Sequence, residues 1–516
     1  MVKTKLHHFL LFLSMIQLSR KGILIMKFIN KLFHLEEKQA SLKTEIIGGL
    51  ITFVAMCYIL PVNSSILSSM GMNQQGVFVM TALLSFFVTM IMGVVANYPI
   101  VLSAGMGLNA YLAYTLSSTF PSWHQRMILL TICGLLFFIF SLTPIRKKII
   151  ESIPKNLKCV ISAALGAFIL FVGLKNSGII VADGGTLVKL GNFADPAMLI
   201  AVIAIFVTIG LMFTKNGVLK TMAIPFGILF AAIAGLTASL IMTSTGAMTV
   251  ENGAGIYQFG TLVGVKTTLP IAPWLTGAKF ADIAPAKDVV FYGLLNDGYS
   301  GEQFGKDIIK VFSSPVSYIA IFSMMFVNLF DTTATLIAVG EKTGVIDENG
   351  KMQNYRKAVL ADATGALVCG PLGTSTVTSF AESNVGVSMG AKTGLAACTA
   401  ALMFLLSAFI YPVFSIFTAF SVTAPALVCV GLMIIANSVS EMDLKSPEIV
   451  FTAAMGVLFA VLCYSISNGI GFALITYCVV KVVQGKQKEV GLPIYIIAGL
   501  FILAFTAETI VGVLTA

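Results

Sequence analysis

Apolar runs of about 15 to 22 residues recur along nearly the whole chain, and short polar loops separate them. As a helix, each run is long enough, or nearly so, to cross the roughly 30 Å hydrocarbon layer of a bilayer. The first seven runs lie near residues 46–67, 76–95, 99–116, 127–142, 160–174, 196–213 and 222–241. The second seven lie near residues 319–339, 358–372, 376–389, 393–410, 424–436, 449–464 and 469–483. With an extra apolar segment at 493–513, the pattern predicts an all-α polytopic membrane protein.

Basic loops test this count of spans, because cytoplasmic loops of membrane proteins carry an excess of Lys and Arg. If the N-terminus is inside, the basic loops all fall on the cytoplasmic side: 144–158, 214–220, 341–357 and 481–488. The opposite side receives the uncharged loop 68–76 and the long, mixed-charge segment 243–315. We therefore predict a cell-membrane protein with a cytoplasmic N-terminus.

The first 25 residues combine a short apolar stretch with basic residues but lack a small-residue cleavage site, so they make a poor signal peptide. A second methionine, Met26, opens a segment that reads as an amphipathic, cytoplasmic approach to the first span. Translation from Met1 and translation from Met26 both stay open, and N-terminal sequencing distinguishes them.

Composition agrees with a membrane protein, since 57% of residues are hydrophobic and 11% charged, against roughly 45–50% and 25% in soluble domains. The formal charge of +9 comes from Lys and Arg in short loops, where it orients the protein in the bilayer and does not indicate nucleic-acid binding. The eight cysteines lie within or at the ends of apolar runs without metal-ligand spacing. We expect no disulfide, metal site or cofactor.

Two carboxylates interrupt the apolar pattern, Asp331 within 319–339 and Glu382 within the small-residue stretch 373–390. A charge at bilayer depth costs at least about 2.5 kcal/mol, so such residues usually line a bundle interior or a substrate pathway. We therefore place the function of the chain at these two positions.

An odd number of spans in each half predicts two halves of opposite orientation, the arrangement called an inverted repeat. The third and tenth spans support it, because each joins a short β-prone stretch, 100–102 or 376–378, to a small-residue break. Half-helices that begin in mid-membrane would present unpaired N–H groups to a substrate. The alternative is that the glycines of these spans only allow close helix packing: Gly105, Gly107, Gly386 and Gly390.

The eighth span carries a polar stripe at helical spacing, formed by Asn328, Asp331, Thr332 and Thr335. A face turned to lipid could not tolerate it. The two threonines fit a hydrogen-bonded seam between helices as well as a substrate path. Asp331 is harder to explain as a seam, and we predict a pathway role for it.

Several motifs together resemble the purine nucleobase permeases of the azaguanine-type branch of the nucleobase:cation symporter-2 (xanthine/uracil permease) family. The resemblance covers about residues 44–486, and its motifs lie at 44–63, 103–114, 326–347 and 361–395. It implies a uracil-permease-like fold of 14 helices as 7+7 inverted repeats, proton symport, and a homodimer. The family's binding positions correspond to Asn109, Asp331 and Glu382.

The resemblance also implies a core domain of spans 1–4 and 8–11 and a gate domain of spans 5–7 and 12–14, with the substrate between them. The expected segments are a cytoplasmic N-terminal segment at 1–43, core halves at 44–142 and 316–415, gate halves at 143–242 and 416–485, an outer insertion at 243–315 and an extra C-terminal segment at 486–516. Relatives often read VDLFD in span 8, where this chain has Asn328 in VNLFD. The outer insertion is also longer than expected.

The chemistry of these side chains fits a purine base. Guanine and hypoxanthine present N–H donors on a planar edge, which a carboxylate can accept in pairs, and Glu382 is the predicted clamp. Asn109 can donate and accept, while Asn328 and Thr332 are further candidates for substrate contact. Phe380 either stacks on the ring or packs in the apolar interior. Adenine, with a partly reversed donor pattern, stays an alternative.

Proton coupling requires a group whose proton affinity changes with its surroundings, and a desolvated carboxylate meets that need. Asp331 and Glu382 are the predicted coupling residues. We interpret Asp362, near a cytoplasmic span start, and Glu508, in the extra segment, as structural or interfacial.

Three other classes remain as alternatives. A membrane enzyme could use Asp331 and Glu382 as an acid–base pair, although no nucleophile elbow, metal set or cofactor loop accompanies them. An anion transporter of the same fold would favour basic or neutral groups where Glu382 lies. A channel would show flux without dependence on a proton gradient.

Overall fold

The computed structural model describes residues 20–143, 153–244, 301–343, 345, 352–415 and 417–515. The helices of the first half are α2 (Arg20–Phe33), α3 (Leu42–Met56), α4 (Ile59–Ser68), α5 (Gln74–Ile91), α6 (Met106–Ala113), α7 (Trp123–Leu142), α9 (Lys155–Asn176), α10 (Pro196–Met212), α11 (Gly217–Thr221) and α12 (Ala223–Ser244). Those of the second half are α16 (Gly301–Ser313), α17 (Pro315–Thr343), α18 (Tyr355–Cys369), α19 (Ser383–Ser388), α20 (Gly394–Ser407), α21 (Tyr411–Ser415), α22 (Phe420–Glu441), α23 (Pro447–Leu462), α24 (Ile466–Val483) and α25 (Leu492–Thr515). The strands are β1 (Leu102–Ala104), β2 (Ile180–Asp183), β3 (Leu187–Leu190) and β4 (Val377–Ser379).

Within the described ranges, 7 helical stretches are long and apolar enough to cross a membrane: Leu42–Ser68, Gln74–Ala96, Trp123–Leu142, Lys155–Asn176, Pro315–Thr333, Phe420–Glu441 and Ile466–Val483. Shorter apolar helices lie at Pro196–Met212, Ala223–Ala238, Gly394–Ile410, Pro447–Leu462 and Leu492–Leu503. The predicted third and tenth spans instead form a strand followed by a short helix, β1 with α6 and β4 with α19. The prediction of a mostly helical, multi-pass membrane protein is confirmed.

The first span is interrupted between α3 and α4, and Pro61 explains why. Proline has no N–H, and its ring would clash with the carbonyl four residues earlier, which belongs to Cys57. That carbonyl accepts a hydrogen bond from the Leu60 N–H instead, at 3.2 Å. The break leaves Tyr58 between the two helical pieces.

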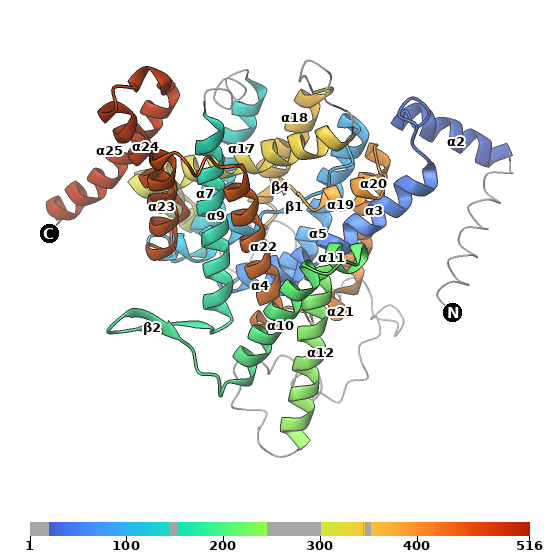
Figure 1. Ribbon diagram of the computed structural model, residues 1–516, viewed down its shortest axis with the longest axis horizontal. Helices are drawn as coiled ribbons and strands as arrows, with labels where there is room; N and C mark the ends of the chain where they lie inside the picture. The colour runs from blue at the N-terminus through green and yellow to red at the C-terminus, as the bar shows by residue number, and fades with distance from the viewer. Residues whose placement is uncertain are drawn as a thin grey trace.

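Strands β1 and β4 lie side by side at the centre of the bundle and pair antiparallel, with Leu102 opposite Ser379 (Figure 1). Neighbouring helices supply hydroxyl groups to the outer edges of this pair. Thr89 of α5 donates to the Leu102 carbonyl and accepts from the Leu102 N–H, both at 3.0 Å. Thr335 of α17 donates to the Ser379 carbonyl at 3.1 Å. Extended backbone survives at membrane depth only where protein satisfies it in this way.

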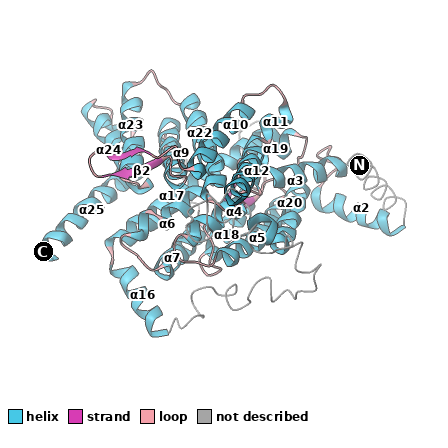
Figure 2. Ribbon diagram, turned by 90° about the horizontal axis from the view of Figure 1, so that it is seen from below, coloured by secondary structure: helices cyan, strands magenta, loops and turns pink. Residues whose placement is uncertain are grey.

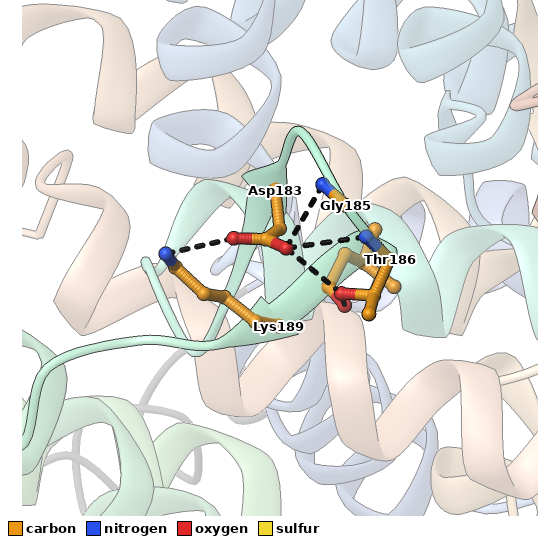
Figure 3. Close-up of polar contacts among 5 residues, drawn as sticks. Asp183, Gly185, Thr186 and Lys189 are labelled. Carbon is orange, nitrogen blue, oxygen red and sulfur yellow. Dashed lines mark hydrogen bonds and ion pairs between the residues drawn. The ribbon is translucent and has the colours of Figure 1, made fainter.

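A hairpin of β2 and β3 projects from the bundle between α9 and α10 (Figure 1), and Figure 3 shows the polar contacts of its turn. Asp183 holds its turn: Oδ2 accepts from the N–H groups of Gly185 and Thr186, each at 3.2 Å, and from the Thr186 hydroxyl at 3.0 Å. Lys189 forms an ion pair with the other oxygen at 2.8 Å. The Lys189 contact, followed by those of Thr186 and Gly185, lowers the pKa of Asp183 below its ordinary value. The sequence did not predict this hairpin.

Helices α2 and α25 extend at opposite ends of the molecule (Figure 2). Phe33 and Leu35, at and after the end of α2, are buried against the bundle beside Cys398 of α20. The extra C-terminal helix α25 packs on α24 and α17, where the rings of Phe501 and Phe322 lie 5.8 Å apart. In the predicted outer insertion, residues 245–300 lie outside the described ranges, and its end forms α16, which packs on α7 and α17.

Candidate functional site

Glu382 lies between β4 and α19, where the tenth span is interrupted. Its Oε1 accepts a hydrogen bond of 2.7 Å from the hydroxyl of Tyr58. Tyr58 is only 3% exposed and lies at the interruption of the first span. The breaks in two spans that are far apart in sequence therefore meet through this one bond.

Asp331 and Asp362 lie close to the same place. Asp331 is partly exposed on α17, whereas Asp362 of α18 is completely buried. The Asp362 carboxylate accepts from Thr332 at 2.7 Å and from Ser379 of β4 at 3.5 Å. The carboxylates of Asp362 and Glu382 are both near enough to Asp331 to act on it electrostatically.

Of the two interpretations of Asp362, structural or interfacial, the structure favours the structural one. Its position on α18 turns the side chain inward, toward α17 and β4, so that a third carboxylate joins the two that the sequence predicted. Glu508 lies in α25, and its side chain falls outside those the structure describes.

Asn109 lies in α6 and takes part in a buried chain of hydrogen bonds. Its Nδ2 donates to Asn63 Oδ1 of α4 at 2.9 Å. The Asn63 amide then donates to Thr81 of α5 at 2.8 Å and to Thr374, just before β4, at 3.1 Å. Nothing among the described residues donates to Asn109 Oδ1, which is buried. Buried oxygens of this kind usually have a partner, so this acceptor is available to a ligand.

The polar stripe of α17 divides into two parts. Thr332 and Thr335 donate to Asp362 and to the Ser379 carbonyl, so their hydroxyls form the seam between helices that the sequence left open. Asn328 is 2% exposed, and in the described part of the chain its Oδ1 has no donor. The stripe therefore offers a second buried acceptor beside the seam.

Phe380 is 7% exposed and belongs to the main apolar core, and its N–H donates to the Val101 carbonyl at 3.0 Å. This placement favours the packing alternative for its ring. The backbone bond extends the pairing of β1 and β4 by one more contact.

The start of α19 differs from the prediction for a mid-membrane half-helix. The N–H groups of Ser383, Asn384 and Val385 donate to carbonyls of the preceding turn at 3.1, 3.0 and 2.9 Å. The expectation that this end presents unpaired N–H groups is therefore wrong, because a tight turn satisfies them. The polar chemistry here comes from the side chain of Glu382.

Close packing explains part of the glycine pattern. A Cβ on Gly107 would overlap Leu165 of α9, and a Cβ on Gly386 would overlap Gly48 and Thr52 of α3. Gly390 has a φ of 100°, a left-handed conformation that favours glycine. The glycines therefore allow close helix packing, and they do so within spans that are also interrupted.

Sequence reasoning missed Tyr58, Asn63 and the internal position of Asp362. A signal for the first two was present, since Pro61 lies between them and breaks the helix at this depth. In the part of the chain that the structure describes, no group of three or more His, Cys, Asp or Glu residues could hold a metal ion.

The sequence model of the permease family, Xan_ur_permease, matches residues 43–461. The chain belongs to this family. It is 37% identical to the guanine/hypoxanthine permease PbuO of Bacillus subtilis over 91% of this chain and 98% of the relative. It is 31% identical to the adenine permease AdeP of Escherichia coli over 92% of this chain and 95% of the relative. The family is one of permeases, so the chain is not an enzyme.

Solved structures show the same fold at low identity. The transmembrane domain of the cyanobacterial bicarbonate transporter BicA aligns with a TM-score of 0.53 and 13% identity, over 83% of this chain and 97% of that one. Murine Slc26a9, an anion transporter in the inward-facing state, aligns with a TM-score of 0.52 and 10% identity, over 86% of this chain and 69% of that one. These two likenesses concern the fold alone.

Proposed function

We propose that the protein is a secondary active transporter that imports purine nucleobases. Guanine and hypoxanthine are the favoured substrates and adenine is the alternative, because relatives named for both groups match nearly the whole chain. The observation that carries the proposal is the set of hydrogen-bond acceptors on the third, eighth and tenth spans. Purine N–H groups could donate to the Glu382 carboxylate. They could also donate to two buried amide oxygens that accept no hydrogen bond from the described residues, Asn109 Oδ1 and Asn328 Oδ1.

The contacts between helices support the inverted repeat. If each span corresponds to the one seven places later, α5 against α20 corresponds to α18 against α7, and α10 against α12 corresponds to α23 against α24. Two further pairs, α9 with α22 and β1 with β4, join each element to its own counterpart. A two-fold axis in the membrane plane produces such self-pairing.

Contacts also favour the division into core and gate. The helices assigned to each domain pack mainly with one another, and the connections between domains are few. Near the C-terminal end of α6, Tyr111 and Ser467 of α24 share a hydrogen bond of 2.5 Å, and Thr115 donates to the Tyr464 carbonyl at 2.7 Å. In alternating access, movement of core against gate would break these two contacts.

Asp331 and Glu382 are the proposed proton-coupling residues, because each is a carboxylate at membrane depth and the two interact. A cytoplasmic N-terminus, a cell-membrane location and a homodimer complete the proposal on the family resemblance and the loop charges.

Uptake into cells that lack their own purine carriers tests the function. We expect saturable accumulation of labelled guanine and hypoxanthine that a protonophore abolishes, and unlabelled bases competing in a panel then rank the substrates. Flux unaffected by the protonophore would remove proton coupling and favour a channel.

Anion transport is the second candidate, because the sequence left open an anion transporter of the same fold. The three gathered carboxylates disfavour it, because like charges repel an anion. If sulfate or dicarboxylates inhibited uptake and purines did not, anion transport would replace purine transport as the favoured function.

A further inference from the structure

The first span gives the site a side chain that fixes its carboxylate. Glu382 precedes α19 at the position of an N-cap, yet its side chain makes no capping hydrogen bond to the described N–H groups of that helix. The bond that holds it comes instead from Tyr58, 324 residues earlier in the chain. A glutamate has three side-chain torsions, so an unheld carboxylate at this position would sample several orientations.

We propose that Tyr58 is the positioning residue for Glu382 in substrate binding. The inference rests on the proposed function, since it assigns Tyr58 to the site where a purine would bind. The Tyr58 hydroxyl takes one lone pair of Oε1 and thereby fixes the plane of the carboxylate. A carboxylate has about four lone-pair positions, so acceptor capacity remains on both oxygens for a purine edge.

Tyr58 reaches Glu382 from the turn between α3 and α4, just before Pro61. The backbone of Cys57 and Tyr58 stays right-handed in this turn, so the first span keeps its course while its hydrogen bonding changes. The same span also orients Asn109, because Asn63 of α4 accepts a hydrogen bond from the Asn109 amide. The first span thus orients a group from the third span and a group from the tenth.

Tyr58→Phe removes the hydroxyl and keeps the ring. Because a fixed carboxylate binds with less loss of side-chain freedom, we expect the purine Kd to rise about tenfold. The KM for uptake should rise with it, while the maximal rate per folded transporter stays within about twofold of the wild type. A merely structural loss would lower the amount of folded protein and leave KM unchanged.

Tyr98→Phe is the matched control, because Tyr98 is also a buried tyrosine and donates its hydroxyl to a backbone carbonyl, that of Gln353. Glu382→Asp supplies the second arm, since a carboxylate shortened by one methylene no longer reaches the hydroxyl. If Tyr58 acts through Glu382, Tyr58→Phe has no further effect on purine Kd or on the unfolding temperature in the Glu382→Asp background.

These outcomes distinguish failure of the positioning role of Tyr58 from failure of the proposed purine transport. An unchanged KM in Tyr58→Phe, an equal loss in Tyr98→Phe, or additive effects with Glu382→Asp would each overturn the positioning role while purine binding by the wild type stands. If the wild type binds no purine, the proposed function falls, and the unfolding cycle alone decides the Tyr58–Glu382 contact. Non-additive unfolding then supports the contact, and additive unfolding overturns it.

Discussion

Replacing Glu382 by Gln is the most direct test of the proposed site. The substitution keeps the size of the side chain, and the remaining Oε1 can still accept from Tyr58. That contact turns the new NH2 group toward the place of the other oxygen, so a purine N–H would meet a second donor instead of an acceptor.

The size of the effect follows from two losses. A hydrogen bond to a charged group contributes about 1.5–3 kcal/mol, and a buried donor left without a partner costs about 1–3 kcal/mol. Because these terms overlap, we expect a net loss of about 2–5 kcal/mol, which raises the purine Kd at least about 30-fold.

Equilibrium binding of labelled guanine to purified protein measures this change, and thermal unfolding of the same samples measures folding. Glu36→Gln is the control, because Glu36 is an exposed glutamate in the turn after α2. A Glu382→Gln protein that unfolds like the wild type and binds guanine with unchanged affinity would refute the clamp.

Other changes address coupling, packing and the projecting hairpin. Asp331→Asn mimics a protonated carboxyl, so we expect exchange of internal for external base to persist in proteoliposomes while accumulation driven by a proton gradient fails; gradient-driven accumulation would exclude Asp331 as the obligatory proton carrier. Gly107→Val forces a side chain against Leu165, and we expect a loss of about 1–3 kcal/mol in unfolding free energy, measured by denaturation. Asp183, whose pKa is lowered by Lys189, stabilises the hairpin at neutral pH and loses this effect as the pH falls through its folded-state value. Hydrogen exchange corrected for intrinsic rates should show that the hairpin's protection falls on acidification in the wild type, and much less in Asp183→Asn.

Much of the fold could be predicted because its strongest signals are local. An apolar run long enough to cross a bilayer can be recognised in the sequence without knowledge of its neighbours in space. The helices α9, α22 and α24 accordingly lie close to the predicted runs. Extended backbone was expected at 100–102 and 376–378, and the strands lie at Leu102–Ala104 and Val377–Ser379. The hairpin was missed because its strands are short and the apolar side chains of β3 are exposed, so no buried face marks the strand in the sequence.

The site was harder to predict, because it depends on contacts between distant segments. Glu382 and Asp331 stand out as charges in apolar runs, whereas Tyr58 is an ordinary residue of a membrane span until its partner is known. The position of Asp362 near a span start suggested the membrane surface. Only the packing of α18 against β4, together with the hydrogen bond from Thr332 of α17, brings it inside.

The pairing of β1 with β4 has a consequence for how the protein is made. Strand β1 ends at Ala104 and its partner begins at Val377, so about 270 residues separate them. At about 5–20 residues per second, a ribosome needs roughly 15 to 55 s to supply the missing strand. Through that interval the segment Leu102–Ala104 is without its strand partner, so the central pairing of the fold is completed only after most of the chain has been made.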